Sequence, residues 1–319
     1  MASARCFGRV IAGVLTLLAA NAAFGQDSYP HHLIRILTSE AGSTNDIVAR
    51  IVARGLATSL GQQAIVENRG GPAADAVARA PADGYSILLY GSSVWVLPYF
   101  RRMSYDPLRD LAPISSAYSQ AIVLLVHPSL PVRSVKELMA LAKARPGDLN
   151  YSAGTIAATP HLAMELFKYL SGLDIVRINY KGTGPAVNAL LAGEVQVMFT
   201  GAGSIMQHVK SGRLRALAVT TVERSPLTPG LPTVAESGLP GYEFTSVVGI
   251  FAPAKTPPPI LNLLSQEIVK ILRKPEVSEM LFESGVAALG GTPEDFAARV
   301  KADIDRWRKV IQDTGIRVE

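Results

Sequence analysis

Small and hydroxyl-bearing residues gather near the start of the chain, where an apolar run gives way to a helical pattern. Residues 39–46 (SEAGSTND) follow the apolar run 33–37, and apolar pairs recur at helical spacing over residues 47–54. The first free N–H groups of a helix, together with the positive end of its dipole, favour an anion. The same side chains can also cap the helix, and one residue can do both. The candidate ligand contacts in this stretch are Ala41, Gly42, Ser43, Thr44 and Asp46.

Four later stretches have the same small, hydroxyl-rich composition, and each lies at the end of a predicted strand: residues 91–95, 152–161, 180–185 and 200–204. Two of the five stretches lie in the first third of the chain and three in the middle third. If these thirds form separate lobes, helix starts from both can hold a carboxylate across a cleft, and the lobes can close on it by hinge motion without any chemistry. The candidates they add are Ser92, Trp95, Ala153, Gly154, Thr159, His161, Tyr180, Gly184, Thr200 and Gly201.

A structural role competes with ligand contact at the larger candidate side chains. Trp95 suits a cleft wall or a packed core, and His161, just inside a helix start, suits a structural hydrogen bond or a ligand contact. Tyr180 and Gly184 fit a turn followed by a helix start as well as they fit a binding loop. Trp307 lies on a terminal amphipathic pattern and is predicted to be core.

The sequence motifs of common enzyme classes are missing. The chain has no GxSxG elbow, no GxxxxGK[ST] loop and no HExxH, and its five histidines are scattered. No pair of carboxylates suggests acid–base catalysis. An exported hydrolase remains the rival from another class, and it needs a serine within hydrogen-bond reach of a histidine, for which His161 with Ser92 is the pair to check. We therefore expect no enzyme, no cofactor and no metal site.

The first 25 residues have the pattern of a secretory signal peptide. Arg5 and Arg9 precede the short apolar run 10–20 (VIAGVLTLLAA), and a small residue precedes Gln26, the expected first residue of the mature protein. The single cysteine, Cys6, lies among the positive charges and not at a cleavage site, which argues against a lipoprotein. We expect a periplasmic protein without disulfides.

The charge of the chain argues against nucleic acid as a partner. The formal net charge is +5, and it falls to about +3 when the signal peptide is removed. No run of lysine and arginine is interleaved with aromatic residues, so nucleic-acid binding is not expected. A mild basic excess is compatible with a small anionic ligand.

Short apolar runs alternate with helical patterns along most of the chain, which predicts an α/β fold with largely parallel sheets. Strands are expected at residues 33–37, 63–67, 85–90, 121–126, 149–152, 175–179, 195–199, 214–220 and 244–251. Helices are expected from residue 47, over 73–80 and 134–144, from 159, over 186–192, after 204, after the prolines 257–259 to about 273, and over 277–284 and 293–313.

Ten segments, in order along the chain, carry a resemblance to a known family: residues 29–30 (YP), 46–50 (DIVAR), 66–69 (VENR), 80–85 (APADGY), 105–107 (YDP), 134–138 (SVKEL), 149–151 (LNY), 180–186 (YKGTGPA), 214–220 (LRALAVT) and 232–238 (PTVAESG). With these segments the chain resembles the Bug family of periplasmic solute-binding proteins, the receptors of tripartite tricarboxylate transporters. The resemblance covers essentially all of the expected mature chain.

The resemblance implies a two-lobed, type II periplasmic-binding-protein fold with the ligand cleft between the lobes. Lobe one would comprise residues 27–125 and 246–319, lobe two residues 126–245, and the crossing strands would lie near 121–127 and 244–252. The implied ligand is a small carboxylate, held in the loops 39–46 and 152–161. The implied partners are membrane transporter subunits, with a receptor for a sensor kinase as the alternative, and the protein is expected to be a monomer.

Two departures from the family pattern bear on the ligand. The family's first loop usually reads PF-x-PGG-x-xD, whereas residues 38–46 read TSEAGSTND, which puts the negative charge of Glu40 near the expected anion site. Between Arg69 and Val77 the chain is shorter than the family's glycine-rich loop by roughly four residues, about one helical turn. One wall of the cleft is therefore expected to be more open.

Overall fold

The structure, a computed structural model, describes residues 29–154 and 156–314. The predicted signal peptide, with Cys6, lies outside the described residues. Among the described helices, none is both long and apolar enough to cross a bilayer.

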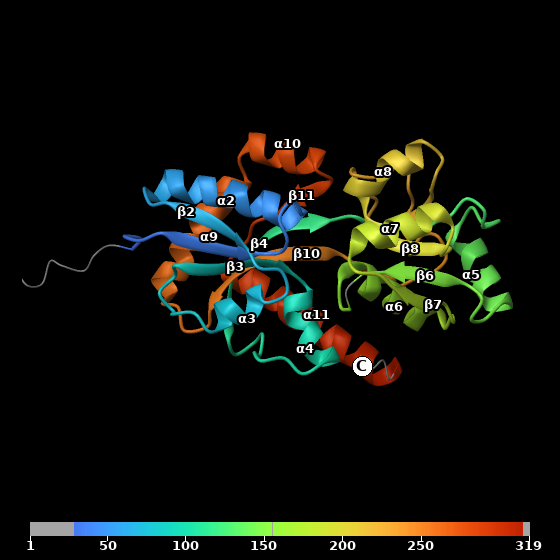
Figure 1. The fold of residues 1–319 in the computed structure, drawn as a ribbon, viewed down its shortest axis with the longest axis horizontal. Helices are drawn as coiled ribbons and strands as arrows, with labels where there is room; N and C mark the ends of the chain where they lie inside the picture. Colours follow the sequence, from blue (N-terminus) through green and yellow to red (C-terminus); the bar gives the residue numbers. More distant parts are fainter. Residues whose placement is uncertain (1–28, 155, 315–319) are drawn as a thin grey trace, which may run out of the picture.

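Two sheets form the two lobes seen side by side in Figure 1. The first sheet has the strand order β11-β4-β10-β3-β1-β2, and the second has the order β7-β6-β8-β5-β9. The first consists of β1 (Ile34–Thr38), β2 (Ala64–Asn68), β3 (Ser86–Gly91), β4 (Leu111–Gln120), β10 (Ser246–Pro253) and β11 (Val286–Ala288). The second consists of β5 (Ile122–Val126), β6 (Asn150–Ala153), β7 (Val176–Asn179), β8 (Val197–Gly201) and β9 (Arg215–Val219).

Both sheets are mixed, which corrects the expectation of largely parallel sheets. Strand β1 is parallel to β2 and β3, whereas β10 is antiparallel to both β3 and β4. In the second sheet β6 is parallel to β7 and β8, and β5 is antiparallel to β8 and β9. Strands β5 and β10 enter their sheets directly from the other lobe, without the helical crossover that a parallel neighbour requires.

Helices cover the faces of each sheet (Figure 1). The first lobe carries α2 (Thr44–Leu60), α3 (Ala73–Ala78), α4 (Ser93–Phe100), α9 (Pro258–Leu272), α10 (Pro275–Glu283) and α11 (Pro293–Thr314). The second carries α5 (Val135–Ala144), α6 (Thr159–Ser171), α7 (Thr183–Ala192) and α8 (Ala202–Lys210). Most follow the 3.6-residue apolar pattern of a helix that buries one face.

The chain passes between the lobes at two points. Strand β4 ends at Gln120, and after Ala121 strand β5 pairs with β8 and β9. Residues 122–125, expected in lobe one, therefore belong to the second sheet, because their ladder partners all lie there. The chain returns at Thr245, since the Phe244 N–H donates to the Thr220 carbonyl of the second lobe and Ser246 pairs with Gln120 in the first sheet.

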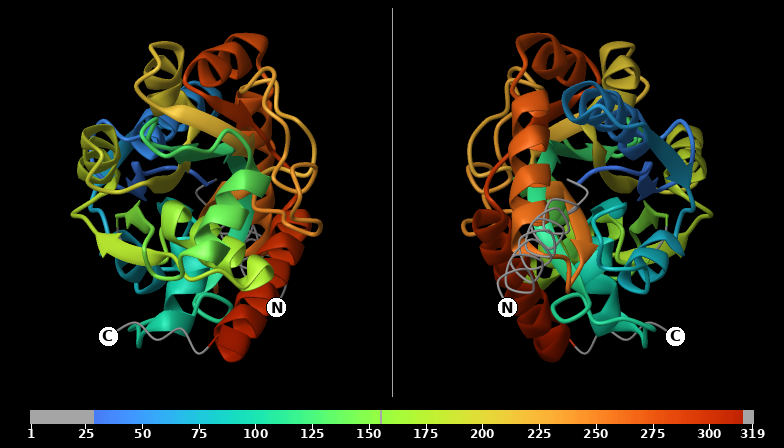
Figure 2. Two further views of the ribbon diagram at one scale, coloured as in Figure 1. Left: turned by 90° about the vertical axis from the view of Figure 1, so that its right-hand side faces the viewer. Right: turned by 90° about the vertical axis from the view of Figure 1, so that its left-hand side faces the viewer.

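Helix α11 adds a third link between the lobes. It runs along one edge of the molecule, and its end reaches the second lobe (Figures 1 and 2). There the Tyr169 hydroxyl of α6 donates to Asp313, and Trp307 packs against Phe244 and Phe100. One apolar core cluster accordingly runs through both lobes on this side.

Candidate functional site

Five helices begin at the boundary between the lobes, around two adjoining hollows. The hollows have volumes of about 270 and 330 Å³. The starts of α2 and α4 border them from the first lobe, and the starts of α6, α7 and α8 border them from the second. Six residues line both hollows: Ser43, Thr44, Gln120, Ala158, Thr159 and Thr183.

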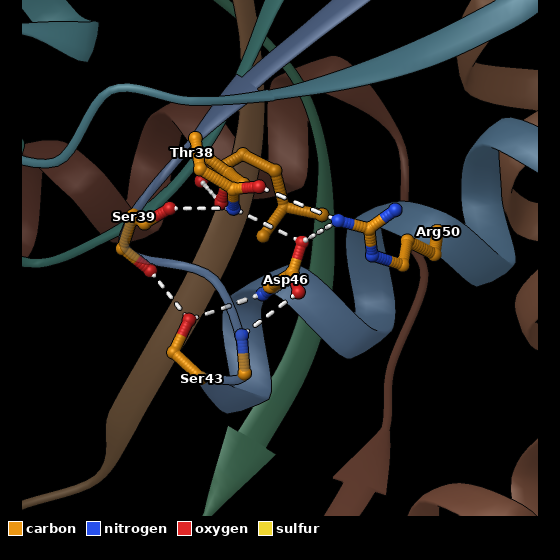
Figure 3. A network of polar contacts seen from close by, with 8 residues as sticks. Thr38, Ser39, Ser43, Asp46 and Arg50 are labelled. Carbon is orange, nitrogen blue, oxygen red and sulfur yellow. Dashed lines mark hydrogen bonds and ion pairs between the residues drawn. The ribbon is translucent and has the colours of Figure 1, made fainter.

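The start of α2 is fixed by reciprocal capping. The Ser43 hydroxyl accepts a hydrogen bond from the Asp46 N–H at 3.2 Å, and the Asp46 carboxylate accepts one from the Gly42 N–H at 2.9 Å. Asn68 donates to the same carboxylate at 3.0 Å, and Arg50 forms an ion pair with it at 3.0 Å (Figure 3). Every oxygen of this cap is thus engaged in holding the loop that presents Ser43 and Thr44.

The Asp46 carboxylate holds the loop and is not among the groups that line the hollows. Asp46 is 5% exposed, and Figure 3 shows its carboxylate in contact with Arg50. Burial by itself raises the pKa of Asp46, but the hydrogen bonds from Gly42 and Asn68 and the charge of Arg50 outweigh it and hold the pKa below its ordinary value. The lowered pKa favours the charged form of Asp46 in this cap.

Six of the sequence-predicted residues are brought together around the hollows: Ser43, Thr44, Ser92, Thr159, Thr200 and Gly201. Nine others are not among the described lining residues: Ala41, Gly42, Asp46, Trp95, Ala153, Gly154, His161, Tyr180 and Gly184.

Two of these nine have clear structural roles. Trp95 lies inside α4 and is fully buried against Phe251 and Phe296, with its indole N–H donating to Asp303 at 3.3 Å, so the prediction of a cleft wall is wrong and core packing holds. Gly42 has a φ of 78°, and a Cβ there would meet nothing within 4 Å. Its glycine is needed for the backbone turn and not for ligand space.

Further lining residues were not among the candidate ligand contacts: Asn45, Tyr90, Gly91, Ser93, Tyr118, Gln120, Ala158, Pro160, Thr183, Ser246 and Val248. Six of them lie inside the small, hydroxyl-rich stretches that the sequence singles out: Asn45, Gly91, Ser93, Ala158, Pro160 and Thr183. Tyr118 and Gln120 come from β4, a strand that the apolar pattern does not reveal. Their presence follows from strand pairing and not from any local motif.

Tyr118 fixes the orientation of one polar side chain in the cleft. Its hydroxyl donates to the carbonyl oxygen of the Asn45 side chain, which leaves the Asn45 amide N–H₂ as a donor. Burial raises the pKa of Tyr118 well above its ordinary value, so the phenol stays protonated. The start of α2 therefore presents hydroxyls and an amide donor.

The described residues that line the hollows carry no formal charge. Positive potential there comes from backbone N–H groups and helix dipoles. A negative charge lies near one edge: burial and then the nearby Glu40 carboxylate raise the pKa of the lining residue Tyr90 to about 12. The Glu40 side chain also stands over Gly70, where a Cβ would come within 2.7 Å of Oε1.

The lobes touch across the cleft at a pair of hydroxyls. The hydroxyl oxygens of Thr159 in α6 and Ser246 in β10 lie 3.1 Å apart. Both residues line the hollow of about 270 Å³. This contact connects the two walls at a point next to the return crossing at Thr245.

The structure does not bring His161 and Ser92 together, the pair that the sequence singles out for a hydrolase. The ring nitrogens of His161 face the Ala157 N–H and the Arg177 guanidinium, and not Ser92. A Ser129–His127 contact of 2.7 Å exists, but it lies in an exposed turn at the end of β5 away from the hollows. Among the described residues, no group of histidine, cysteine and carboxylate side chains is placed to hold a metal ion.

Removing the Ser43 hydroxyl should lower the stability of the folded protein. Ser43→Ala leaves the Asp46 N–H without its acceptor, so we expect the free energy of unfolding to fall by about 1 kcal/mol, while Ser43→Gly should cost only a few tenths. Urea unfolding of the two variants measures the difference. Equal stability of all three proteins would show that Asp46 alone holds the helix start.

Comparisons with known proteins agree with this geometry. A profile of the family described as "Tripartite tricarboxylate transporter family receptor" matches residues 48–316. Protein BugT of Bordetella pertussis is 35% identical over 301 residues, which cover 92% of this chain and 92% of BugT.

Two solved structures from Rhodopseudomonas palustris have the same fold and carry organic acids. Rpa4515 with adipate matches with a TM-score of 0.81 and 34% identity, over 91% of this chain and 99% of that one. MatC (Rpa3494) with bound malate matches with a TM-score of 0.78 and 27% identity, over 89% of this chain and all of that one. The expected two-lobed α/β fold is confirmed.

Proposed function

The chain belongs to the tripartite tricarboxylate transporter receptor family, and on that premise we propose that it captures a small organic acid between its lobes and delivers it to a membrane transporter. The observation that carries the proposal is the convergence of five helix starts on two uncharged, hydroxyl-lined hollows. Free N–H groups at helix starts, each at the positive end of a dipole, are donors suited to a carboxylate.

A dicarboxylate fits the arrangement best. Donors from the first lobe (Thr44 and Asn45) face donors from the second (Ala158 and Thr159), so each lobe can receive one end of the ligand. Volumes of about 270 and 330 Å³ lie at the lower end of the range for small-molecule sites. The related proteins Rpa4515 and MatC hold adipate and malate, which supports the same ligand class here.

The remaining parts of the proposal concern location and role. The signal-peptide pattern of residues 1–25 supports export to the periplasm. Membership of a receptor family supports binding without catalysis, with the membrane subunits of a tripartite transporter as the partner. We propose that the protein acts as a monomer, since one chain supplies both walls of the cleft.

A panel of acids and matched neutral compounds tests the ligand class. At a concentration about a hundred times its Kd, a bound dicarboxylate should raise the free energy of unfolding by about 2.7 kcal/mol. Thermal unfolding with adipate, malate and adipamide, the uncharged diamide of adipate, separates charge from shape. Native mass spectrometry of the protein taken directly from the periplasm then identifies the natural ligand. Binding of the diamide as tightly as of the acid would contradict an anion site.

A further inference from the structure

The turn that leads into α6 has an unusual backbone. Ala157 is fully buried and has a φ of 58°, the left-handed region that residues with a Cβ rarely adopt. The next two residues, Ala158 and Thr159, line the cleft. The conformation of Ala157 therefore sets the direction in which the second lobe presents its donors, and some contact must hold it.

His161 supplies that contact from behind the turn. Its side chain is 1% exposed, and its Nδ1 accepts a hydrogen bond from the Ala157 N–H at 3.2 Å. Phe100, at the end of α4 in the first lobe, packs edge-on against the imidazole with ring centroids 5.9 Å apart. The ring is thus enclosed and keeps one orientation.

Two N–H donors compete for this imidazole. Arg177 Nη1 lies 2.7 Å from Nε2, while the Ala157 amide faces Nδ1. A neutral imidazole has one acceptor nitrogen and one N–H, so it satisfies one of the two donors at a time. Arg177 is half-exposed and can turn to water, whereas the Ala157 amide is buried. The tautomer with its proton on Nε2 is therefore favoured, because it pairs the buried Ala157 amide and leaves only Arg177 to bond to water.

The surroundings of His161 favour the neutral ring. Burial is the largest influence on the pKa of His161 and lowers it. The Glu165 carboxylate raises the pKa and the charges of Arg177 and Lys168 lower it, and the net result is a pKa of about 4. Glu165 is itself occupied, since it accepts from the Tyr151 hydroxyl at 2.6 Å and pairs with Lys168 at 3.3 Å. From the first lobe, α4 brings the apolar Phe100 and, at its end, the exposed Arg101, which lines a surface hollow with Gly154 and Ile156.

We propose that His161 is a positioning residue: its neutral imidazole accepts the Ala157 amide and so holds the turn that presents Ala158 and Thr159 to the ligand. A protonated ring has no acceptor and faces N–H donors at both nitrogens, so it releases the turn. The inference rests on the proposed capture of an organic acid, because the turn matters through the donors it aims.

Two substitutions at His161 separate the acceptor from the bulk. In His161→Asn the side-chain oxygen takes the place of Nδ1 and keeps an acceptor that does not titrate, and affinity for the acid should stay within about threefold of the wild type. In His161→Leu the volume is kept but the acceptor is lost, and affinity should fall about tenfold or more. Equal losses in both variants would overturn the proposal, since packing alone would then explain them.

A second histidine provides the matched control. His127 also accepts a backbone N–H on its Nδ1, from Ser129 at 3.3 Å, but in an exposed turn away from the cleft. His127→Asn and His127→Leu should leave affinity for the acid unchanged. Calorimetry on all four variants, with circular dichroism to check the fold, gives the comparison.

The pH profile is a readout that a purely structural role would not move. The ratio of wild-type to His161→Asn affinity should be flat from about pH 7 to pH 5 and should fall as the pH approaches 4, where the wild-type ring gains its proton. Taking the ratio cancels the titration of the ligand itself. A ratio that stays constant down to pH 4 would contradict the proposal.

Amide hydrogen exchange tests the turn without any ligand. The Ala157 amide should exchange about tenfold faster in His161→Leu than in His161→Asn, and faster in the wild type below pH 4 than above it after correction for intrinsic rates. If no acid binds to any variant, the proposed function fails, while this measurement still decides the role of His161. Unchanged exchange in His161→Leu would overturn that role, and if this variant does not fold, the wild-type profile alone decides.

Discussion

Replacing Thr44 by glutamate should abolish capture of an organic acid and leave the fold intact. Thr44 is the first residue of α2 and lines both hollows, so the new carboxylate would stand on the wall where the anion is proposed to bind. Two like charges about 4 Å apart repel by roughly 4 kcal/mol at the effective dielectric near a protein surface, which is about a thousandfold in affinity. The helix itself should tolerate the change, because a negative charge in its first turn is stabilising.

Thr44→Gln is the control, because it has nearly the same shape as Thr44→Glu without the charge. It should cost roughly tenfold or less. Calorimetry with an acid identified by the panel, at low and high salt, measures both variants, and the gap between them should narrow as salt screens the repulsion. If glutamine weakened binding as much as glutamate, steric bulk would be the cause and the electrostatic argument for this wall would fail.

A second large effect is expected in the core of the first lobe. A Cβ at Gly249 of β10 would lie 1.8 Å from Cζ of Phe296 in α11. The ring cannot easily withdraw, because Trp95 and Phe251 pack on it with centroid distances of 6.0 and 5.0 Å. Gly249→Ala should therefore lower the free energy of unfolding by about 3 kcal/mol through overpacking.

The neighbouring strand offers a matched control for this prediction. A Cβ at Gly91, which pairs with Val248, would meet only a methyl group at 3.6 Å, an ordinary contact. Gly91→Ala should cost less than about 1 kcal/mol in urea unfolding, and Phe296→Leu should recover part of the loss caused by Gly249→Ala. Similar costs at the two glycines would mean that the aromatic cluster shifts freely.

The elements that the sequence predicts well are those with a continuous apolar pattern. Strand β5 (IVLLV) is buried at every position, and its apolar run marks it plainly. Strand β4 (LAPISSAYSQ) carries a proline and several serines, and the hydroxyl of the buried Ser115 donates to the Gly291 carbonyl at 2.9 Å. That partner lies far away in the chain, so nothing local indicates the strand. Strand β11 has three residues and leaves no pattern.

The candidate site divides in the same way. The starts of α2, α4, α6, α7 and α8 all lie in stretches that were predicted to bind a ligand, because small and hydroxyl-bearing residues stand next to one another after a strand end. The floor of the cleft was not predicted, since Tyr118, Gln120, Ser246 and Val248 meet only through pairing of β4 with β10. Within the predicted stretches, the side chains of Asp46 and His161 accept hydrogen bonds from backbone N–H groups four residues earlier in the chain. These backbone groups compete with a ligand for the same side-chain atoms.

The three links between the lobes limit how the width of the cleft can change. Two chain crossings, at Ala121 and Thr245, leave rotation about the line that joins them as the simplest relative motion of the lobes. The hydrogen bond from Tyr169 to Asp313 at the end of α11 is a third link, so a rotation that widens the cleft would have to stretch or break it. Gln120 and Ser246, each next to a crossing, would move least in such a rotation, whereas Thr44 and Thr183 would move with their lobes. A solute that contacts both walls would therefore link the two lobes, which a solute that contacts only the floor would not.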